Sequence, residues 1–197
     1  MNTKENIMQT ALVLFANRGY EAVSVADIAS ELDLTKGALY RHYKSKRDIL
    51  DSIVERIELE DRKRASIYKI PDIRYEQNPK AYSELSIEGI ISYGRNELAY
   101  WTKNEFASSF RRMLTIEQYS DKELEKVYRK YILQDVLVYI EGGFKALGYS
   151  DKSKYMALEF YAPYFTLLNL YDTAENKDEI ELLFEQHSRD FYERYKK

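Results

Sequence analysis

Apolar residues recur every three or four positions along most of the chain, which is the period of an amphipathic α-helix. Two-residue alternation, the signature of strands, is rare. The pattern predicts helices near Lys4–Arg18, Ser45–Ser66, Ala81–Lys103, Glu105–Leu114, Asp121–Leu147, Lys152–Tyr171 and Lys177–Tyr195. We interpret Tyr68–Lys80, which holds two of the three prolines, as a linker. The third, Pro163, should kink or split its helix. The expected fold is all-α.

Between Ser24 and Leu50 the pattern changes to shorter helices separated by a tight turn. Ser24 can cap a helix, and Asp27 three residues later completes a capping box. Asp33 and Leu34 leave room only for a tight turn before Thr35, which is a second good N-cap. Two short helices across such a turn form a helix-turn-helix unit, whose second helix enters the major groove of DNA.

The helix after Thr35 has one apolar and one polar face. At 100° per residue Leu39 points into the core, while the opposite face carries Lys36, Gly37, Tyr40, Arg41 and Lys44. Gly37 costs a helix roughly 1 kcal/mol relative to alanine, but it lets the backbone approach a partner closely. From position 36 to 47 there are five Lys or Arg residues and no acid. A solvated basic face is the alternative, but the two caps, the turn and the glycine together favour DNA binding.

These residues resemble the tetracycline-repressor (TetR) family of one-component transcription regulators. The resemblance covers roughly residues 7 to 50, about a quarter of the chain. It runs through Ala11, Phe15, Gly19–Tyr20, Val23–Ser24–Val25, Ile28–Ala29, Leu32, Leu34–Thr35, Gly37, Leu39–Tyr40, His42–Tyr43, Ser45–Lys46 and Leu50. Asp33 departs from the turn glycine that is usual in the family, but aspartate tolerates a left-handed backbone better than most residues.

The resemblance implies an N-terminal three-helix helix-turn-helix DNA-binding domain, residues 1–46, and a C-terminal helical effector-binding and dimerisation domain, residues 47–197. We expect Thr35, Lys36, Gly37, Tyr40 and Arg41 nearest the base edges, and Ser24, His42, Lys44 and Lys46 on phosphates. Residues 1–47 carry seven Lys or Arg and five Asp or Glu, a balance of +2. The whole chain is at −3, so −5 remains for the rest, which fits a site-specific binder of double-stranded DNA.

A seam of apolar residues along the last helix predicts a homodimer. Its members recur at three- and four-residue spacing: Ile180, Leu183, Phe184, His187 and Phe191. One recognition helix spans few base pairs, so a two-fold dimer reading a palindromic operator is expected. The resemblance implies the same, with a four-helix bundle formed by the last two helices of each subunit.

The resemblance also implies a cavity for a small-molecule effector. Within Asp121–Leu147, one helix face would carry Tyr128, Tyr131, Asp135 and Tyr139, a carboxylate among tyrosines. Neighbouring aromatic clusters supply Trp101, Phe110, Tyr161 and Tyr164. Such walls suit an aromatic or cationic ligand. The alternative is that these rings fill the core or the dimer interface, with Asp135 hydrogen-bonded or exposed.

Several function classes find no support in the sequence. There is no cysteine, so thiol and cysteine-zinc chemistry are excluded, and two histidines form no metal cluster. We expect no cofactor, no catalytic residues and no membrane segment, since no apolar run approaches ~18 residues. The expected protein is a cytoplasmic, ligand-responsive repressor released from its operator by the effector. An activator of the same fold and a helical protein-interaction module remain alternatives, and salt dependence of binding separates the latter.

Overall fold

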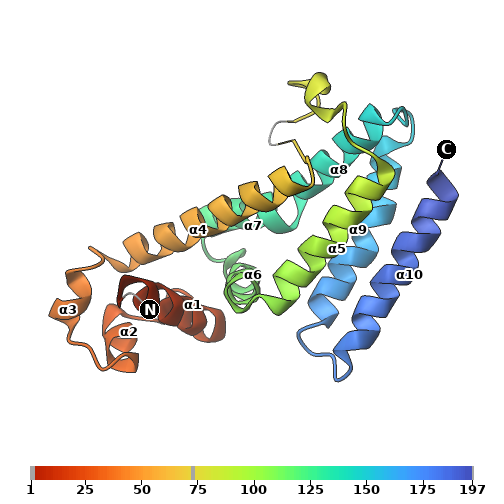
Figure 1. Cartoon of the computed structure of the whole chain (residues 1–197). Coiled ribbons are helices and arrows are strands. Elements are labelled where there is room, and N and C mark those ends of the chain that lie inside the picture. The colour runs from red at the N-terminus through yellow and green to blue at the C-terminus, as the bar shows by residue number, and fades with distance from the viewer. Residues whose placement is uncertain (1–2, 72–73, 197) are drawn as a thin grey trace. The chain divides into compact units, whose positions relative to one another are not determined.

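The computed structural model describes residues 3–71 and 74–196, and every regular element within those ranges is helical (Figure 1). The all-α prediction is confirmed. The elements are α1 (Thr3–Arg18), α2 (Val25–Glu31), α3 (Lys36–Tyr40), α4 (Lys46–Ile67), the 3-10 helix η1 (Pro79–Tyr82), α5 (Ile87–Lys103), α6 (Glu105–Glu117), α7 (Lys122–Ile132), α8 (Gln134–Ala146), α9 (Ser153–Leu170) and α10 (Lys177–Tyr195).

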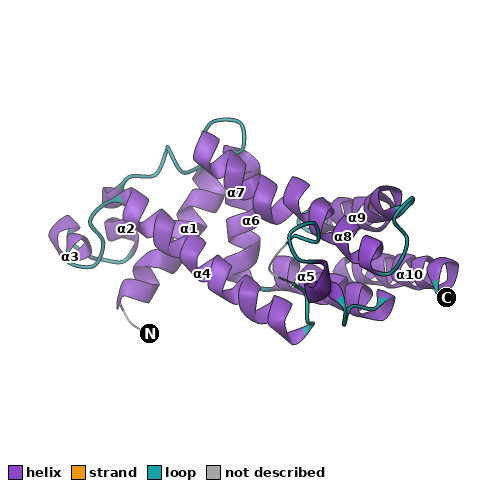
Figure 2. Cartoon of the chain, turned by 90° about the horizontal axis from the view of Figure 1, so that it is seen from above, coloured by secondary structure: helices purple, strands orange, loops and turns teal. Residues whose placement is uncertain are grey.

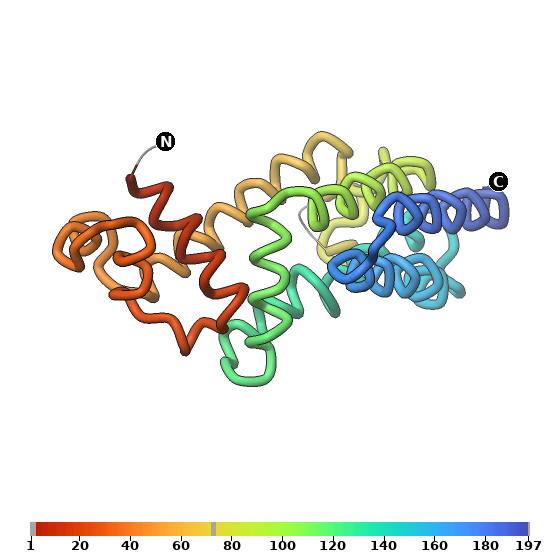
Figure 3. The backbone as a smooth tube through the Cα atoms, turned by 90° about the horizontal axis from the view of Figure 1, so that it is seen from below, coloured from red at the N-terminus to blue at the C-terminus, as the bar shows by residue number. Residues whose placement is uncertain are grey.

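The helices form two compact units. The N-terminal unit comprises Met1–Asp61 and Asn104–Tyr128, and the C-terminal unit comprises Arg62–Lys103 and Arg129–Lys197. These units do not follow the expected boundary between residues 46 and 47. Two features explain the difference: α4 continues past that boundary without a break, and α6 packs against α1 (Figure 3).

The N-terminal unit has a core of aliphatic and phenylalanine side chains. Its helices are amphipathic, and each turns its apolar face inward. The fully buried side chains include Ile7, Leu12, Phe15, Ile28, Leu39, Ile49, Leu50, Ile53 and Phe110. Burial of each such side chain contributes about 1.5–3 kcal/mol. The expected inward orientation of Leu39 is therefore confirmed, and it fixes which face of α3 is left for a partner.

The C-terminal unit has an aromatic core. Helices α5, α9 and α10 run alongside one another, and α8 packs on α9 (Figures 1 and 2). Phe160 of α9 contacts Phe184 and Phe191 of α10, with ring centroids 6.3 Å and 5.1 Å apart. Nε2 of His187 donates to the carbonyl oxygen of Phe160 at 3.2 Å, so this ring nitrogen has a partner within the chain.

Three predicted elements differ from the structure. The helix expected over 121–147 is two helices, broken at Leu133, whose φ of −134° and ψ of −95° are not helical. The hydroxyl of Tyr161 donates to the carbonyl oxygen of Ile132 at 2.6 Å, so a contact remote in sequence satisfies the end of α7. Helix α5 begins at Ile87 rather than at 81, after η1. Pro163 does not split α9, which is continuous. Positions 72 and 73 of the expected linker lie outside the described residues.

Candidate nucleic-acid interface and ligand-binding region

Helix α2 begins at a complete capping box. The amide of Asp27 donates to Oγ of Ser24 at 3.2 Å, and the amide of Ser24 donates to Oδ2 of Asp27 at 2.7 Å. The Ser24 hydroxyl also donates to this oxygen, at 2.6 Å. These bonds to Ser24 lower the pKa of the Asp27 carboxyl, and Arg18 at 3.7 Å adds to the effect. The predicted start of the first helix of the motif is confirmed.

A tight turn joins α2 to α3. Asp33 adopts a left-handed backbone with φ of +54°, as expected where the turn glycine is replaced. The amide of Leu34 donates to the carbonyl of Ala29 at 2.8 Å and closes the turn. Thr35 then caps α3, because its Oγ1 accepts the amide of Ala38 at 3.1 Å. The helix-turn-helix geometry follows from these three local features: the left-handed backbone of Asp33, the hydrogen bond of Leu34 and the N-cap Thr35.

The segment from α3 to the start of α4 is exposed and basic. The structure leaves Ser24, Thr35, Lys36, Gly37, Tyr40, Arg41, His42 and Lys44 on the surface. Tyr40 is 50 % exposed, which is unusual for a large ring and leaves it free to contact a partner. The predicted nucleic-acid residues are therefore each exposed, apart from Lys46, which is half-buried.

Lys46 has partners inside the N-terminal unit. Its Nζ donates to the carbonyl oxygen of Tyr20 at 2.8 Å and to that of Glu21 at 3.4 Å. The ammonium also lies 4.2 Å from the centre of the Tyr20 ring. Burial of that ring raises the pKa of the Tyr20 hydroxyl. An ammonium has three donors, so one remains for a phosphate oxygen.

The expected effector residues do not all fall in one unit. Phe110 and Tyr128 are buried in the N-terminal unit. Trp101, Tyr131, Asp135, Tyr139, Tyr161 and Tyr164 belong to the C-terminal unit. Within it the structure brings Trp101 to Tyr131, with ring centroids 6.4 Å apart, and stacks Tyr161 on Tyr164 at 5.2 Å.

The expected setting of Asp135 is wrong. Because α7 ends at Ile132, Asp135 lies in the first turn of α8 rather than in the middle of one helix with Tyr128 and Tyr131. Its Oδ1 accepts a hydrogen bond from the guanidinium of Arg74 at 2.9 Å, and both side chains are partly exposed. A cationic ligand at Asp135 would have to compete with Arg74.

Sequence reasoning missed a carboxylate that does lie among aromatic rings. Oε1 of Glu97 accepts from Nε of Arg64 at 2.5 Å, and Oε2 accepts from the indole N–H of Trp101 at 3.0 Å. The guanidinium of Arg64 stacks on the ring of Tyr100 at 3.3 Å. The spacing of Glu97 four residues before Trp101 on one helix was a usable signal for this contact.

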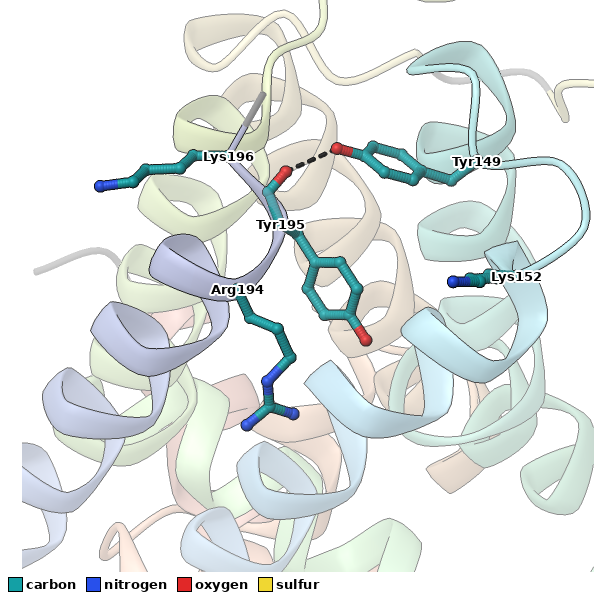
Figure 4. Close-up of a pocket in the computed structure, with 5 residues that line it drawn as sticks. All are labelled: Tyr149, Lys152, Arg194, Tyr195 and Lys196. Carbon is teal, nitrogen blue, oxygen red and sulfur yellow. Dashed lines mark hydrogen bonds between the residues drawn. The ribbon is translucent and has the colours of Figure 1, made fainter.

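A pocket of about 500 Å³ opens at the end of α10 (Figure 4). It is lined by Tyr149, Lys152, Arg194, Tyr195 and Lys196. The hydroxyl of Tyr149 donates to the carbonyl oxygen of Tyr195 at 2.5 Å across it. None of the expected effector residues lines this pocket, and its cations Arg194 and Lys196 are paired with Glu159 and Glu193.

The apolar seam of α10 is largely a core surface. Ile180, Phe184 and Phe191 are buried against their own chain, and His187 is half-buried among the same rings. Ile180, Phe184 and Phe191 therefore leave almost no side-chain surface for a partner and act as core residues of the single chain, while their place in a dimer interface stays a prediction. Leu183 differs, because it is 48 % exposed.

Other apolar side chains of the last two helices are exposed instead. Tyr155, Leu158 and Ala162 follow one face of α9 at three- and four-residue spacing, and Leu182 is exposed beside Leu183 on α10. Solvated apolar rows of this kind mark interaction surfaces. In the part of the chain that the structure covers, no carboxylate and histidine groups gather as a metal site would require, and no helix has the length and apolarity to cross a bilayer.

Comparison with known proteins agrees with the helix-turn-helix geometry. The model of the family described as bacterial regulatory proteins, tetR family, matches residues 7–53. The first curated relatives align with this chain over a stretch of only 51 to 55 residues. That stretch spans between 18 % and 26 % of the relatives' own length. The transcriptional regulator QacR of Staphylococcus aureus is 26 % identical over 145 residues, which cover 72 % of this chain and 71 % of QacR.

Solved structures extend the likeness to the whole fold. A transcriptional regulator of Aquifex aeolicus superposes with a TM-score of 0.67 at 21 % identity, covering 98 % of this chain and 100 % of its own. The complex of SmeT with triclosan superposes with a TM-score of 0.67 at 16 % identity, covering 98 % of this chain and 91 % of SmeT. SmeT is the repressor of a multidrug efflux pump of Stenotrophomonas maltophilia.

Proposed function

The chain belongs to the TetR family of bacterial regulatory proteins, and from this premise we propose that it is a repressor that binds a palindromic operator as a homodimer and is released by a small molecule. It is a transcription regulator and not an enzyme. The exposed, acid-free basic segment from α3 to the start of α4 carries the proposal, because a short helix presented in this way fits the major groove.

The predicted nucleic-acid residues take different roles in the proposal. Thr35, Lys36, Gly37, Tyr40 and Arg41 approach base edges, since they lie on or beside the short helix that enters the groove. Residues Ser24, His42, Lys44 and Lys46 lie around it and contact phosphates, which fixes the register of the protein on the duplex.

The homodimer is proposed to form through the exposed apolar rows of α9 and α10 rather than through the buried seam. Tyr155, Leu158, Leu182 and Leu183 have their side chains in solvent within the single chain. Burial of these groups against a second copy removes apolar surface from water and places two recognition helices on one duplex.

The effector is proposed to bind the C-terminal unit as an aromatic small molecule. Two observations support this class: Trp101 and Tyr131 lie together near the Glu97 carboxylate, and SmeT, a protein of the same fold, is known in complex with triclosan. For a cationic effector, Asp135 remains a candidate once Arg74 is displaced.

Selection from a random-sequence duplex library tests the proposed function. The proposal expects enriched duplexes with two inverted half-sites one or more helical turns apart. A reporter driven from a promoter containing the selected site should be repressed by the wild-type protein. Failure to enrich any sequence would contradict operator binding and favour a protein-interaction module, while stimulation of the reporter would identify an activator.

A screen of dyes, quaternary amines and neutral aromatic compounds by thermal shift tests the effector. Wild type and Asp135→Asn should be stabilised alike by neutral aromatic ligands, because these need no carboxylate. A cationic ligand that stabilises wild type more than Asp135→Asn would place Asp135 at the site. Absence of stabilisation by every class would contradict a small-molecule effector of this chemistry.

A further inference from the structure

A buried carboxylate in the N-terminal unit joins α6 to the turn that follows α1. Glu117 ends α6 and is 4 % exposed. Its Oε1 accepts the amide of Tyr20, 97 positions earlier in the chain, at 2.7 Å. Its Oε2 accepts the hydroxyl of Ser120 at 2.6 Å. A hydrogen bond to an ionised, buried acceptor is among the stronger ones in proteins, so the turn and the end of α6 are held together.

Lys46 binds the other backbone polar group of Tyr20, its carbonyl oxygen. The carbonyl oxygen of Tyr20 accepts from Nζ of Lys46 at 2.8 Å, and the Tyr20 ring lies under the same ammonium. That ring packs edge-on against Phe15 at 5.0 Å, which fixes it to α1. Lys46 is the first residue of α4 and belongs to the basic segment. The two backbone polar groups of one residue, Tyr20, therefore link an α6 carboxylate to a cation beside the nucleic-acid surface.

The backbone of the turn after α1 lets the Glu117 carboxylate approach closely. Gly19 has a φ of +82°, which a residue with a side chain rarely adopts. A Cβ at Gly19 would lie 3.0 Å from Oε1 of Glu117, tighter than ordinary contact. The turn could not move away from α6 without leaving a buried charge short of a donor, which is costly.

We propose that Glu117 is a positioning residue for DNA binding: through the backbone of Tyr20 it fixes where the Lys46 ammonium lies. The inference rests on the proposed operator binding. It adds that α6, through Glu117, controls the strength of that binding. The third donor of the ammonium then reaches a phosphate oxygen only while Glu117 holds the turn. A change in the position of α6 alters DNA affinity by this route without touching α3.

A double-mutant cycle tests the proposal, with a duplex selected by the wild-type protein as the probe. Glu117→Ala and Lys46→Met should each weaken binding about tenfold, the size expected for losing one such bond. The double variant should lose no more than either single variant, because both changes remove the same link. Losses that multiply to about a hundredfold would show independent residues and overturn the proposal.

Two matched variants separate positioning from general damage. Ser120→Ala removes the other bond to the same carboxylate and should leave affinity within about twofold, since the bond to Tyr20 remains. Glu117→Gln keeps an acceptor oxygen and should recover most of the affinity lost in Glu117→Ala. If Glu117→Ala does not fold, Glu117→Asp, whose carboxylate is one methylene group shorter, replaces it in the cycle. A loss in Ser120→Ala as large as that in Glu117→Ala would contradict the proposed route.

A measurement without DNA separates failure of this proposal from failure of the proposed function. In amide NMR spectra, Glu117→Gln should shift the Tyr20 proton upfield and speed its exchange, with the Ala11 amide unchanged. If the wild type binds no duplex, operator binding fails, and with it the role of Glu117, although the link itself is still observed. If the wild type binds and the Tyr20 amide does not respond, the link is absent and only the positioning proposal fails.

Discussion

Two glycines of the N-terminal unit are constrained for opposite reasons. Gly19 has a left-handed backbone and its missing side chain faces Glu117 at close range. Gly37 lies in α3 on the exposed face, and a Cβ there would meet only Oγ1 of Thr35, at 3.9 Å. Gly19 is therefore required by the fold, whereas Gly37 is not. The proposed approach of DNA to the helix backbone would account for Gly37.

Gly19→Ala is expected to destabilise the protein by about 1–3 kcal/mol, since a side chain in this backbone region is strained. Chemical denaturation monitored by circular dichroism measures the change. An unchanged midpoint would mean that the turn can relax, and that the contact with Glu117 does not depend on a glycine.

Gly37→Ala is expected to act in the other direction on stability. Alanine should stabilise α3 by up to about 1 kcal/mol, because its helix propensity is higher and space is free. Binding to the selected duplex should nevertheless weaken, because the added methyl group keeps the backbone from the groove. Tighter or unchanged binding would remove Gly37 from the interface.

At the scale of elements, the capped N-terminal helices were predictable and the middle helices were not. The N-cap hydrogen bonds that start α2 and α3 join residues three positions apart, such as Ser24 and Asp27. They can therefore be recognised from a short stretch of sequence. The break at Leu133 depends on Tyr161, 29 positions from the carbonyl that it satisfies. Hydrophobic periodicity alone predicted a single helix across this point. It therefore placed Asp135 in the middle of that helix, which is wrong.

The same limit applies to the seam of α10 and to Glu117. A three- and four-residue spacing shows that a helix buries one face, but not whether its own chain or a second copy covers that face. Here Phe160 of α9 covers Phe184 and Phe191. Nothing in the sequence around Glu117 indicates that its carboxylate is buried, and only the structure reveals its contact with Tyr20.

The cap of α2 makes a prediction about protonation. Hydrogen bonds from Ser24 hold the pKa of Asp27 below its ordinary value. The stabilisation is present above that ordinary value and is lost as the pH falls through the lowered one. In Ser24→Ala the pKa of Asp27 should return toward 3.8, which a carboxyl NMR titration measures. A pKa of Asp27 that stays the same in Ser24→Ala would show that the Ser24 hydroxyl does not lower it.

At the scale of the whole molecule, assembly decides whether two recognition helices can read one site. One residue from each candidate interface distinguishes the two. Leu158 of α9 is 54 % exposed and Phe184 of α10 is 1 % exposed. A charge at Leu158 meets water in the single chain, whereas a charge at Phe184 enters its core.

Leu158→Asp is therefore expected to give a folded monomer, and Phe184→Asp an unfolded chain, because an isolated charge in a core is not tolerated. Sedimentation at micromolar concentration with circular dichroism distinguishes these states. A folded monomer for Phe184→Asp together with an intact dimer for Leu158→Asp would return the interface to the seam of α10.

The central claim is that α3 reads a DNA sequence, and a titration of two duplexes tests it most directly. The wild-type affinities for the selected duplex and for a scrambled one are compared over a range of salt concentrations, alongside Tyr40→Ala. The account predicts a preference of at least about a thousandfold for the selected duplex, steep weakening with salt, and a loss of about 1–3 kcal/mol of that preference in Tyr40→Ala. Equal affinity for both duplexes, or binding that ignores salt and Tyr40, would contradict it.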